Sequence, residues 1–123
     1  MSLAAYQRAH RAAEHPRSME ARLLAEISRE IEQAWESGRR GGQLMPALHR
    51  NREMWSTFSA ACGAADNGLP PELRAGVISL ALWVDRHTSA VIIGRESVAP
   101  LLEVNRMLME GLSGSAGTAP RSA

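Results

Sequence analysis

The clearest structural signal in this chain is residues 69–94, which read LPPELRAGVISLALWVDRHTSAVIIG. One stripe in this stretch recurs at steps of three and four, the period of an α-helix; it consists of Leu73, Val77, Leu80, Val84, His87 and Val91. Two prolines precede Glu72, where a missing N–H does no harm to a first helical turn, and Gly94 is expected to end the helix. Ile78, Ala81, Leu82 and Trp83 add apolar surface beside the stripe, so we expect this helix to be the most buried.

On the N-terminal side, three blocks share this helical period. Residues 3–15 predict a short helix that ends at His15-Pro16, and residues 18–37 predict a second, with Ser18 as its N-cap. The glycine- and arginine-rich residues 38–42 lack a phosphate-loop signature and predict a mobile linker. The third block begins around Pro46, and its seam has the spacing of a coiled coil with one polar member: Leu44, Leu48, Asn51, Trp55, Phe58 and Cys62.

On the C-terminal side, residues 66–68 predict a turn, and residues 96–112 predict a last helix with Pro100 in its first turn. Its seam consists of Val98, Leu101, Asn105, Leu108 and Leu112. Residues 113–123 are rich in serine, glycine and alanine and predict a disordered tail. No segment alternates with a period of two for long enough to predict a strand. The sequence therefore predicts an all-α fold, a small antiparallel bundle of four to five helices forming one domain over residues 1–112.

Charge and composition narrow the environment in which the chain acts. The fourteen basic residues are all arginine, thirteen residues are acidic, and the net charge is +1. Because both signs are spread along the chain, direct binding to nucleic acid is not expected. No run of about 20 apolar residues predicts a membrane span. The N-terminus lacks the pattern of a signal peptide, and the single Cys62 suits a reducing compartment, so we expect a cytoplasmic protein.

No set of side chains predicts catalysis, a cofactor or a metal. Asp85 and Ser89 share a helix face, but His87 is rotated by about 200° from both, which excludes a triad. On the apolar stripe, His87 is explained by a hydrogen bond to a neighbouring helix, by a pH-sensitive role or by partner contact. His10 and Glu14 supply only two potential ligands, too few for a zinc site. We expect a binding protein, not an enzyme.

Two asparagines stand out among the apolar seams. Asn51 and Asn105 each occupy a seam position, and each is followed by an arginine, Arg52 and Arg106. A buried asparagine can fix helix register. Alternatively, the bundle has an open groove in which hydrogen bonds read a guest helix, helped by adaptable methionines such as Met109. On this second interpretation, the candidate partner-binding residues are Asn51, Arg52, Asn105, Arg106 and Met109.

Several runs are distinctive enough to suggest a family. They are Asn67-Gly68-Leu69-Pro70, Trp83-Val84-Asp85-Arg86-His87-Thr88-Ser89, Glu103–Leu112, and further upstream Ala5-Tyr6 and Asn51-Arg52 with Trp55. Together they resemble the FlaF family of bacterial flagellar proteins over about residues 3–112. Residues 38–42 and the C-terminal tail match nothing in that pattern.

The resemblance implies a role in flagellum biogenesis in alphaproteobacteria. It implies that the chain controls flagellin production and export, that it binds flagellin in the cytoplasm before secretion, and that it works alongside FlbT, a regulator acting on flagellin messenger RNA. The expected function is thus that of a flagellin-binding export chaperone and regulator of flagellin synthesis. The alternative is a post-transcriptional regulator that contacts flagellin messenger RNA directly or through FlbT.

Overall fold

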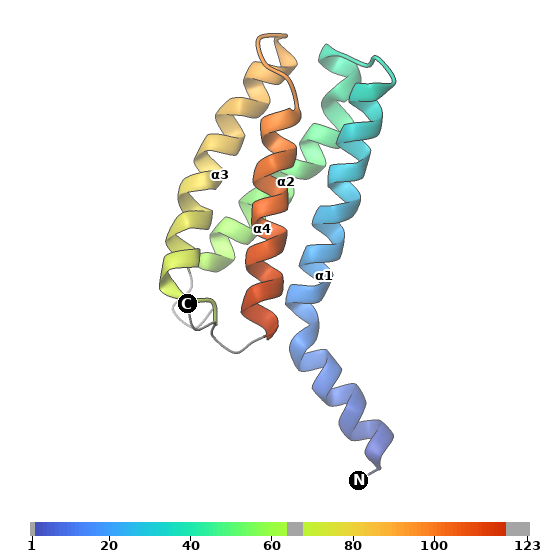
Figure 1. The fold of residues 1–123 in the computed structure, drawn as a ribbon, viewed down its shortest axis with the longest axis vertical. Helices are drawn as coiled ribbons and strands as arrows, with labels where there is room; N and C mark the ends of the chain where they lie inside the picture. Colours follow the sequence, from blue (N-terminus) through green and yellow to red (C-terminus); the bar gives the residue numbers. More distant parts are fainter. Residues whose placement is uncertain (1, 64–67, 118–123) are drawn as a thin grey trace.

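The fold is an all-α bundle, as the periodicity predicts (Figure 1). The computed structural model describes residues 2–63 and 68–117, with side chains described for 2–4, 20–63 and 68–112. The elements in chain order are α1 (Leu3–Glu36), the short 3-10 helix η1 (Gly41–Leu44), α2 (Met45–Cys62), α3 (Pro71–Ile92) and α4 (Ala99–Gly117). No strand occurs in these described ranges.

The helices run alternately up and down, so that neighbours in the chain are antiparallel (Figure 1). α1 packs most closely against α4, and α2 against α3, whereas α3 and α4 make the least extensive contact of the four neighbouring helix pairs. One apolar core lies between all four helices and is lined from α1 by Leu24, Ile27, Ile31 and Ala34. The bundle is therefore built from two tight pairs, with α3 the helix least engaged by α4.

The N-terminal part of the chain differs from the prediction. The two helices predicted at residues 3–15 and 18–37 are instead a single helix, α1, which ends at Glu36 and continues through Pro16 without a break. A proline within a helix removes one backbone hydrogen bond and crowds the preceding turn, and bending can relieve that strain. Figure 1 shows the first turns of α1 projecting beyond the ends of the other helices. The side chains of His10 and Glu14 lie outside the described residues.

The predicted seams of α2 and α4 are confirmed. All six seam residues of the α2 block, from Leu44 to Cys62, are buried, and so are all five of the α4 seam, from Val98 to Leu112. The prediction that α3 is the most buried helix is wrong, because only Val77, Val84, Thr88 and Val91 on it are buried, whereas α2 buries seven residues. The apolar surface of α3 is wider than its neighbours cover, so apolar side chains remain exposed on it.

The connections also refine the prediction. The expected mobile linker at residues 38–42 instead folds into a turn at Gly38 followed by η1. Arg40 stacks its guanidinium 3.4 Å from the centre of the Trp35 ring and donates a 2.9 Å hydrogen bond to the Trp35 carbonyl oxygen. Gly94, with φ of 83°, follows the end of α3 as expected. α4 continues to Gly117, into the segment predicted to be a disordered tail, whereas residues 66, 67 and 118–123 lie outside the described residues.

Candidate partner-binding site

Asn51 of α2 and Asn105 of α4 meet inside the bundle. Both have an exposed fraction of 0%. Asn105 donates from Nδ2 to Asn51 Oδ1 at 2.8 Å and to Ser28 Oγ of α1 at 2.9 Å. Its Oδ1 accepts a 2.7 Å hydrogen bond from the indole Nε1 of Trp55. Asn105 is thus the hub of a buried polar layer that joins α1, α2 and α4.

This layer supports the register interpretation of the two asparagines rather than the groove interpretation. The three hydrogen bonds form together only when α1, α2 and α4 align at one height, so the layer disfavours packing in a shifted register. An open groove lined by Asn51 and Asn105 is absent from the described residues, because apolar neighbours close over both side chains. Both asparagine side chains therefore lie inside the bundle rather than on its surface, and a partner-binding role for them stays a prediction.

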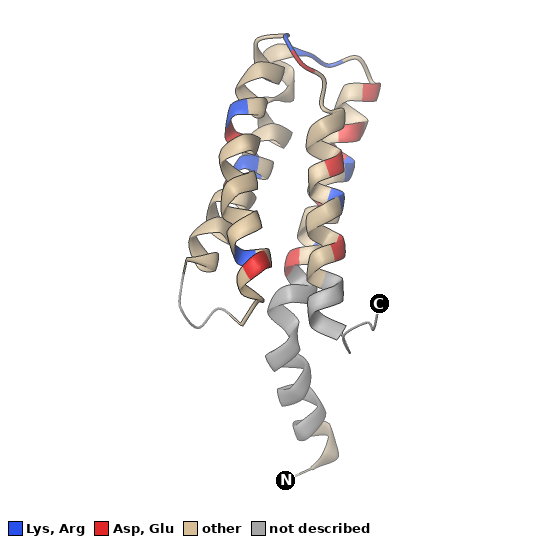
Figure 2. Cartoon of the chain, turned by 60° about the vertical axis from the view of Figure 1, so that its left-hand side comes forward, with Lys and Arg blue, Asp and Glu red and all other residues tan. Residues whose placement is uncertain are grey.

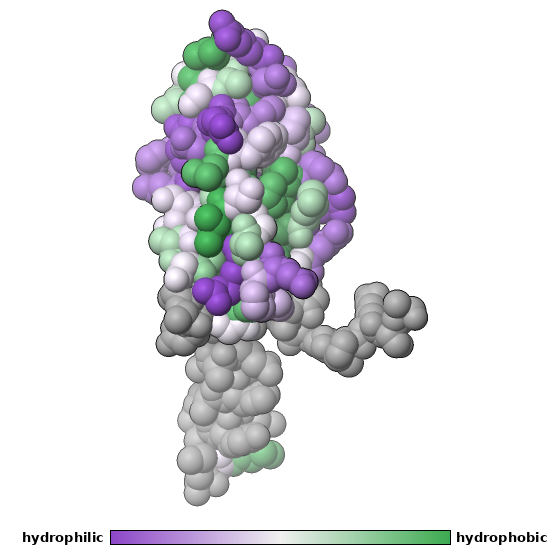
Figure 3. All heavy atoms as spheres, turned by 90° about the vertical axis from the view of Figure 1, so that its left-hand side faces the viewer, coloured by the Kyte–Doolittle hydropathy of each residue, from purple (hydrophilic) through white to green (hydrophobic). Residues whose placement is uncertain are grey.

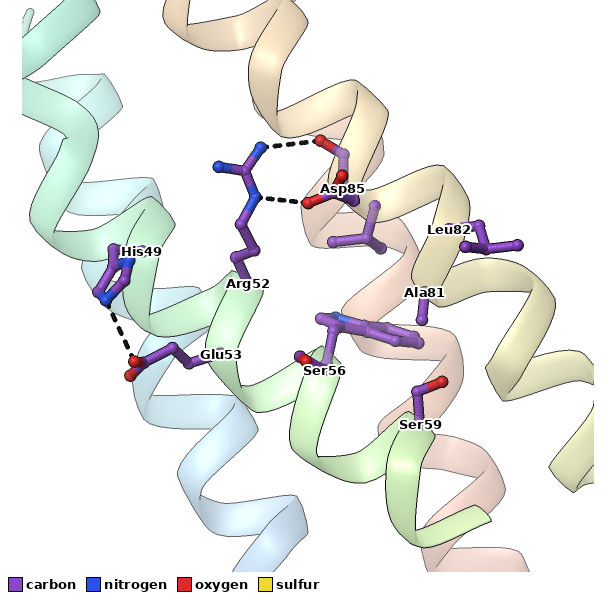
Figure 4. A pocket seen from close by; sticks show the side chains of 10 residues that line it. His49, Arg52, Glu53, Ser56, Ser59, Ala81, Leu82 and Asp85 are labelled. Atoms are coloured by element: carbon purple, nitrogen blue, oxygen red, sulfur yellow. Dashed lines mark hydrogen bonds and ion pairs between the residues drawn. The ribbon is translucent and has the colours of Figure 1, made fainter. Parts of the chain in front are cut away.

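Arg52 is partly exposed and links α2 to α3 instead of pointing with Asn51 into the core. Its Nε lies 2.9 Å from Asp85 Oδ1, and its Nη2 donates to the Asp85 carbonyl oxygen at 2.9 Å (Figure 4). The same Nη2 also donates to Ser89 Oγ of α3 at 2.9 Å. Asp85 and Ser89 therefore share a face, as their spacing predicts. The guanidinium thus acts as a clamp that holds α3 against α2 through one ion pair and two hydrogen bonds from Nη2.

His87 is turned away from this clamp, so Asp85, His87 and Ser89 form no triad. Its Nε2 lies 2.9 Å from the carbonyl oxygen of Ser97, in the connection between α3 and α4. Its ring stacks on Trp83 with centroids 4.7 Å apart and planes inclined by 19°. The hydrogen-bonded interpretation of His87 thus holds, with a loop carbonyl rather than a neighbouring helix as its partner.

Arg106 and Met109 lie away from Arg52. Arg106 is exposed on α4, where it forms ion pairs with Glu103 and with Glu110. The hydrogen bond from Arg106 is the largest cause that lowers the pKa of Glu103. Met109 is partly buried and packs against the core. The candidate residues therefore do not form one surface: two lie in the core, one clamps α3, one is paired on α4, and one is core lining.

A groove that the sequence reasoning missed lies between α2 and α3. It has a volume of about 430 Å³, and Figure 4 shows it from close by. Its floor is apolar, and its rim carries the Arg52–Asp85 pair and a 3.2 Å pair between His49 and Glu53. The lining residues are His49, Arg52, Glu53, Trp55, Ser56, Ser59, Ala81, Leu82, Val84 and Asp85. The available signal was the apolar surface beside the α3 stripe, which exceeds what one core face needs.

Chemically reactive groups are few in the described part of the chain. Cys62 is fully buried, and burial raises the pKa of its thiol, although nearby Arg74 opposes that shift. Across residues 20–63 and 68–112, no three histidine, cysteine or carboxylate side chains cluster as metal ligands would. Within the described helices, none combines the length and hydrophobicity that crossing a bilayer requires.

The described residues thus form a small all-α helical bundle with a buried polar layer in its core and an apolar groove on its surface. The chain belongs to the family described as flagellar protein FlaF, whose family model matches residues 2–112. It is therefore a flagellar protein, and the match extends over nearly the whole chain, as the resemblance in residues 3–112 suggests. No curated protein and no solved structure matches the chain significantly.

Proposed function

We propose that this protein binds flagellin in the cytoplasm and acts in flagellum biogenesis as an export chaperone and regulator of flagellin synthesis. The proposal is supported by membership of the FlaF family and by one structural observation. α3 exposes large apolar side chains, Ile78 and Leu82, beside the apolar floor of the α2–α3 groove. Figure 3 views this side of the molecule, and apolar side chains gather near the centre of the face, bordered by hydrophilic ones. Such a patch marks a surface that another molecule covers.

The physical logic suits flagellin as the covering molecule. The terminal segments of flagellin are amphipathic helices, and their apolar faces would associate prematurely if they met in the cytoplasm. A bundle that offers an apolar strip can cover such a helix by helix-in-groove packing. Burying one leucine-sized side chain contributes about 1.5–3 kcal/mol. On this proposal, the protein binds flagellin and later releases it, and it catalyses no reaction.

Direct recognition of flagellin messenger RNA is the alternative, and the pairing of the arginines weighs against it. Arg50 is paired with Glu30, Arg52 with Asp85, and Arg106 with Glu103 and Glu110. A guanidinium already bound to carboxylates must give them up before it can neutralise a phosphate. Regulation of the messenger through FlbT needs no phosphate contact by this chain, so it is compatible with a protein-binding surface.

Co-purification tests the proposal. The full chain is recovered from the cytoplasm of its native cell, and the bound protein and RNA are identified by mass spectrometry and sequencing. We expect flagellin to be enriched over a control bundle protein carrying the same tag. Recovery of flagellin messenger RNA without flagellin or FlbT would reverse the ranking of the two functions.

A further inference from the structure

We propose that the outer face of α3, together with the α2–α3 groove, is the docking surface for one amphipathic helix of about 18 residues. This inference rests on the proposed function and names the face and the kind of segment that it would use. A second copy of this chain and an extended peptide are the competing occupants. The experiment below distinguishes them.

The first observation is an apolar stripe on α3 that faces away from the bundle. Two of the seven large apolar side chains exposed in the described part of the chain lie on it, Ile78 at 39% and Leu82 at 63%, and a third, Ile93 at 65%, continues it as the C-cap residue just after α3. At 100° per residue these three fall within about 60° of arc. They lie apart from the core stripe of Val77, Val84 and Val91, so α3 carries two apolar stripes and the bundle covers only one.

The second observation is the shape and length of this surface. Ala75 is a small, exposed residue close to the line of the stripe, so a second helix can approach α3 closely there. From Ala75 to Ile93 this face extends about 27 Å at 1.5 Å per residue, with Asp85 and Ser89 between Leu82 and Ile93, and its length matches a guest helix of about 18 residues. Beside Leu82 the groove deepens the strip on the α2 side. A groove along a helix suits a helical guest, whose apolar residues recur at steps of three and four.

The third observation is the distribution of charged residues on this surface, which indicates the side chains that a guest helix should carry. No charged residue lies between Arg74 and Asp85 on α3, and Figure 2 shows this middle part of the helix free of charged residues. On the α2 side, Arg52 and Asp85 pair with each other, and Glu53 lies 3.2 Å from His49. On the other side, exposed Arg86 makes no ion pair within residues 20–63 and 68–112. The surface therefore fits an apolar stripe flanked by uncharged side chains towards α2 and by a carboxylate towards Arg86.

The test uses the full chain, two probes and matched variants. The probes are monomeric flagellin encoded in the same genome and a synthetic 18-residue helix with leucines at steps of three and four and one flanking row of glutamates. Leu82→Glu should weaken the binding of both by about 10- to 100-fold, because it puts a charge where the bound helix covers an apolar side chain. Arg86→Glu should weaken binding severalfold at low salt and have little effect at high salt. The matched control is Met45→Glu, at a site exposed by 40% on the first residue of α2, which should leave affinity unchanged within about twofold.

Thermal melts accompany each titration, and Ile78→Gln is a second stripe variant with a milder change. If flagellin binds equally well to wild type, Leu82→Glu and Ile78→Gln, the docking face is wrong while the proposed function stands. If only the synthetic helix binds and Leu82→Glu abolishes that binding, the face stands and flagellin is the wrong guest. Sedimentation of a wild-type dimer that Leu82→Glu dissociates would assign the face to a second copy and overturn the inference. Failure of both probes to bind wild type overturns it as well.

Discussion

The buried polar layer makes the sharpest energetic prediction for this fold. Asn105→Ala removes the acceptor of the Trp55 indole N–H and the donor to Asn51 Oδ1, and the residues of both partners are at most 1% exposed. A buried polar group left without a partner costs about 1–3 kcal/mol, so the two together cost about 2–6 kcal/mol. Ser28 is only partly buried and can bond to water instead. Because small domains have only about 5–15 kcal/mol of stability, Asn105→Ala should remove a large part of it.

Asn51→Ala is the matched control within the same layer. Asn51 Nδ2 has no hydrogen-bond partner among the described residues, so this substitution removes an unsatisfied group along with one hydrogen bond. Asn105 retains its bonds to Ser28 and Trp55 in that variant. The expected loss in the free energy of unfolding is therefore smaller, about 1–2 kcal/mol.

Urea unfolding followed by circular dichroism measures both losses under one set of conditions. We expect the loss for Asn105→Ala to exceed that for Asn51→Ala by at least about 1 kcal/mol. Equal losses in the free energy of unfolding for the two variants, or a loss below about 1 kcal/mol for Asn105→Ala, would mean that water reaches the polar layer. Loss of flagellin binding by Asn105→Ala with unchanged stability would restore the groove interpretation of this residue.

Three further predictions use the same unfolding assay or simple chemistry. Gly94→Ala should destabilise the fold by about 1–2 kcal/mol, since Gly94 has φ of 83°, whereas Gly76→Ala within α3 meets no atom within 4 Å and should stabilise it by about 0.5–1 kcal/mol. Met109→Ala should destabilise by about 1–3 kcal/mol, because Met109 is partly buried core lining; an unchanged melting temperature would contradict this placement. Cys62 should resist alkylation until the protein unfolds. Because its folded pKa is raised, stability should fall as pH rises above the ordinary thiol pKa, and a rise there would contradict the shift.

The sequence predicts where the helices lie along the chain better than it predicts how the helices pack against one another. Spacing alone identifies the α2 seam, all of which is buried, because a coiled-coil pattern defines a single face. At Pro16 the prediction is wrong, since the local preference for ending a helix does not say whether a bend can absorb the proline. The sequence shows that α3 carries a wide apolar surface. How much of that surface is covered depends on how closely α4 packs against α3.

The candidate site shows the same limit. Seam position predicts that Asn51 and Asn105 lie among apolar neighbours, and both do. Whether two seams face each other at one height depends on the tertiary packing of α2 and α4, so the 2.8 Å bond between the asparagines could not be predicted. The same reason hides the clamp from Arg52 to α3, because Asp85 is distant in sequence and adjacent only in the folded bundle.

Direct titration of purified monomeric flagellin with the full chain, at about 50 and 200 mM salt, tests the central proposal most directly. Apolar burial on a surface of nearly balanced charge predicts saturable binding whose dissociation constant changes by less than about fivefold between the two conditions. An RNA-binding protein that contacts several phosphates would lose about a thousandfold or more in affinity over the same range. Flagellin that fails to bind at either salt concentration, together with tight and steeply salt-dependent binding of flagellin messenger RNA, would contradict the proposed function.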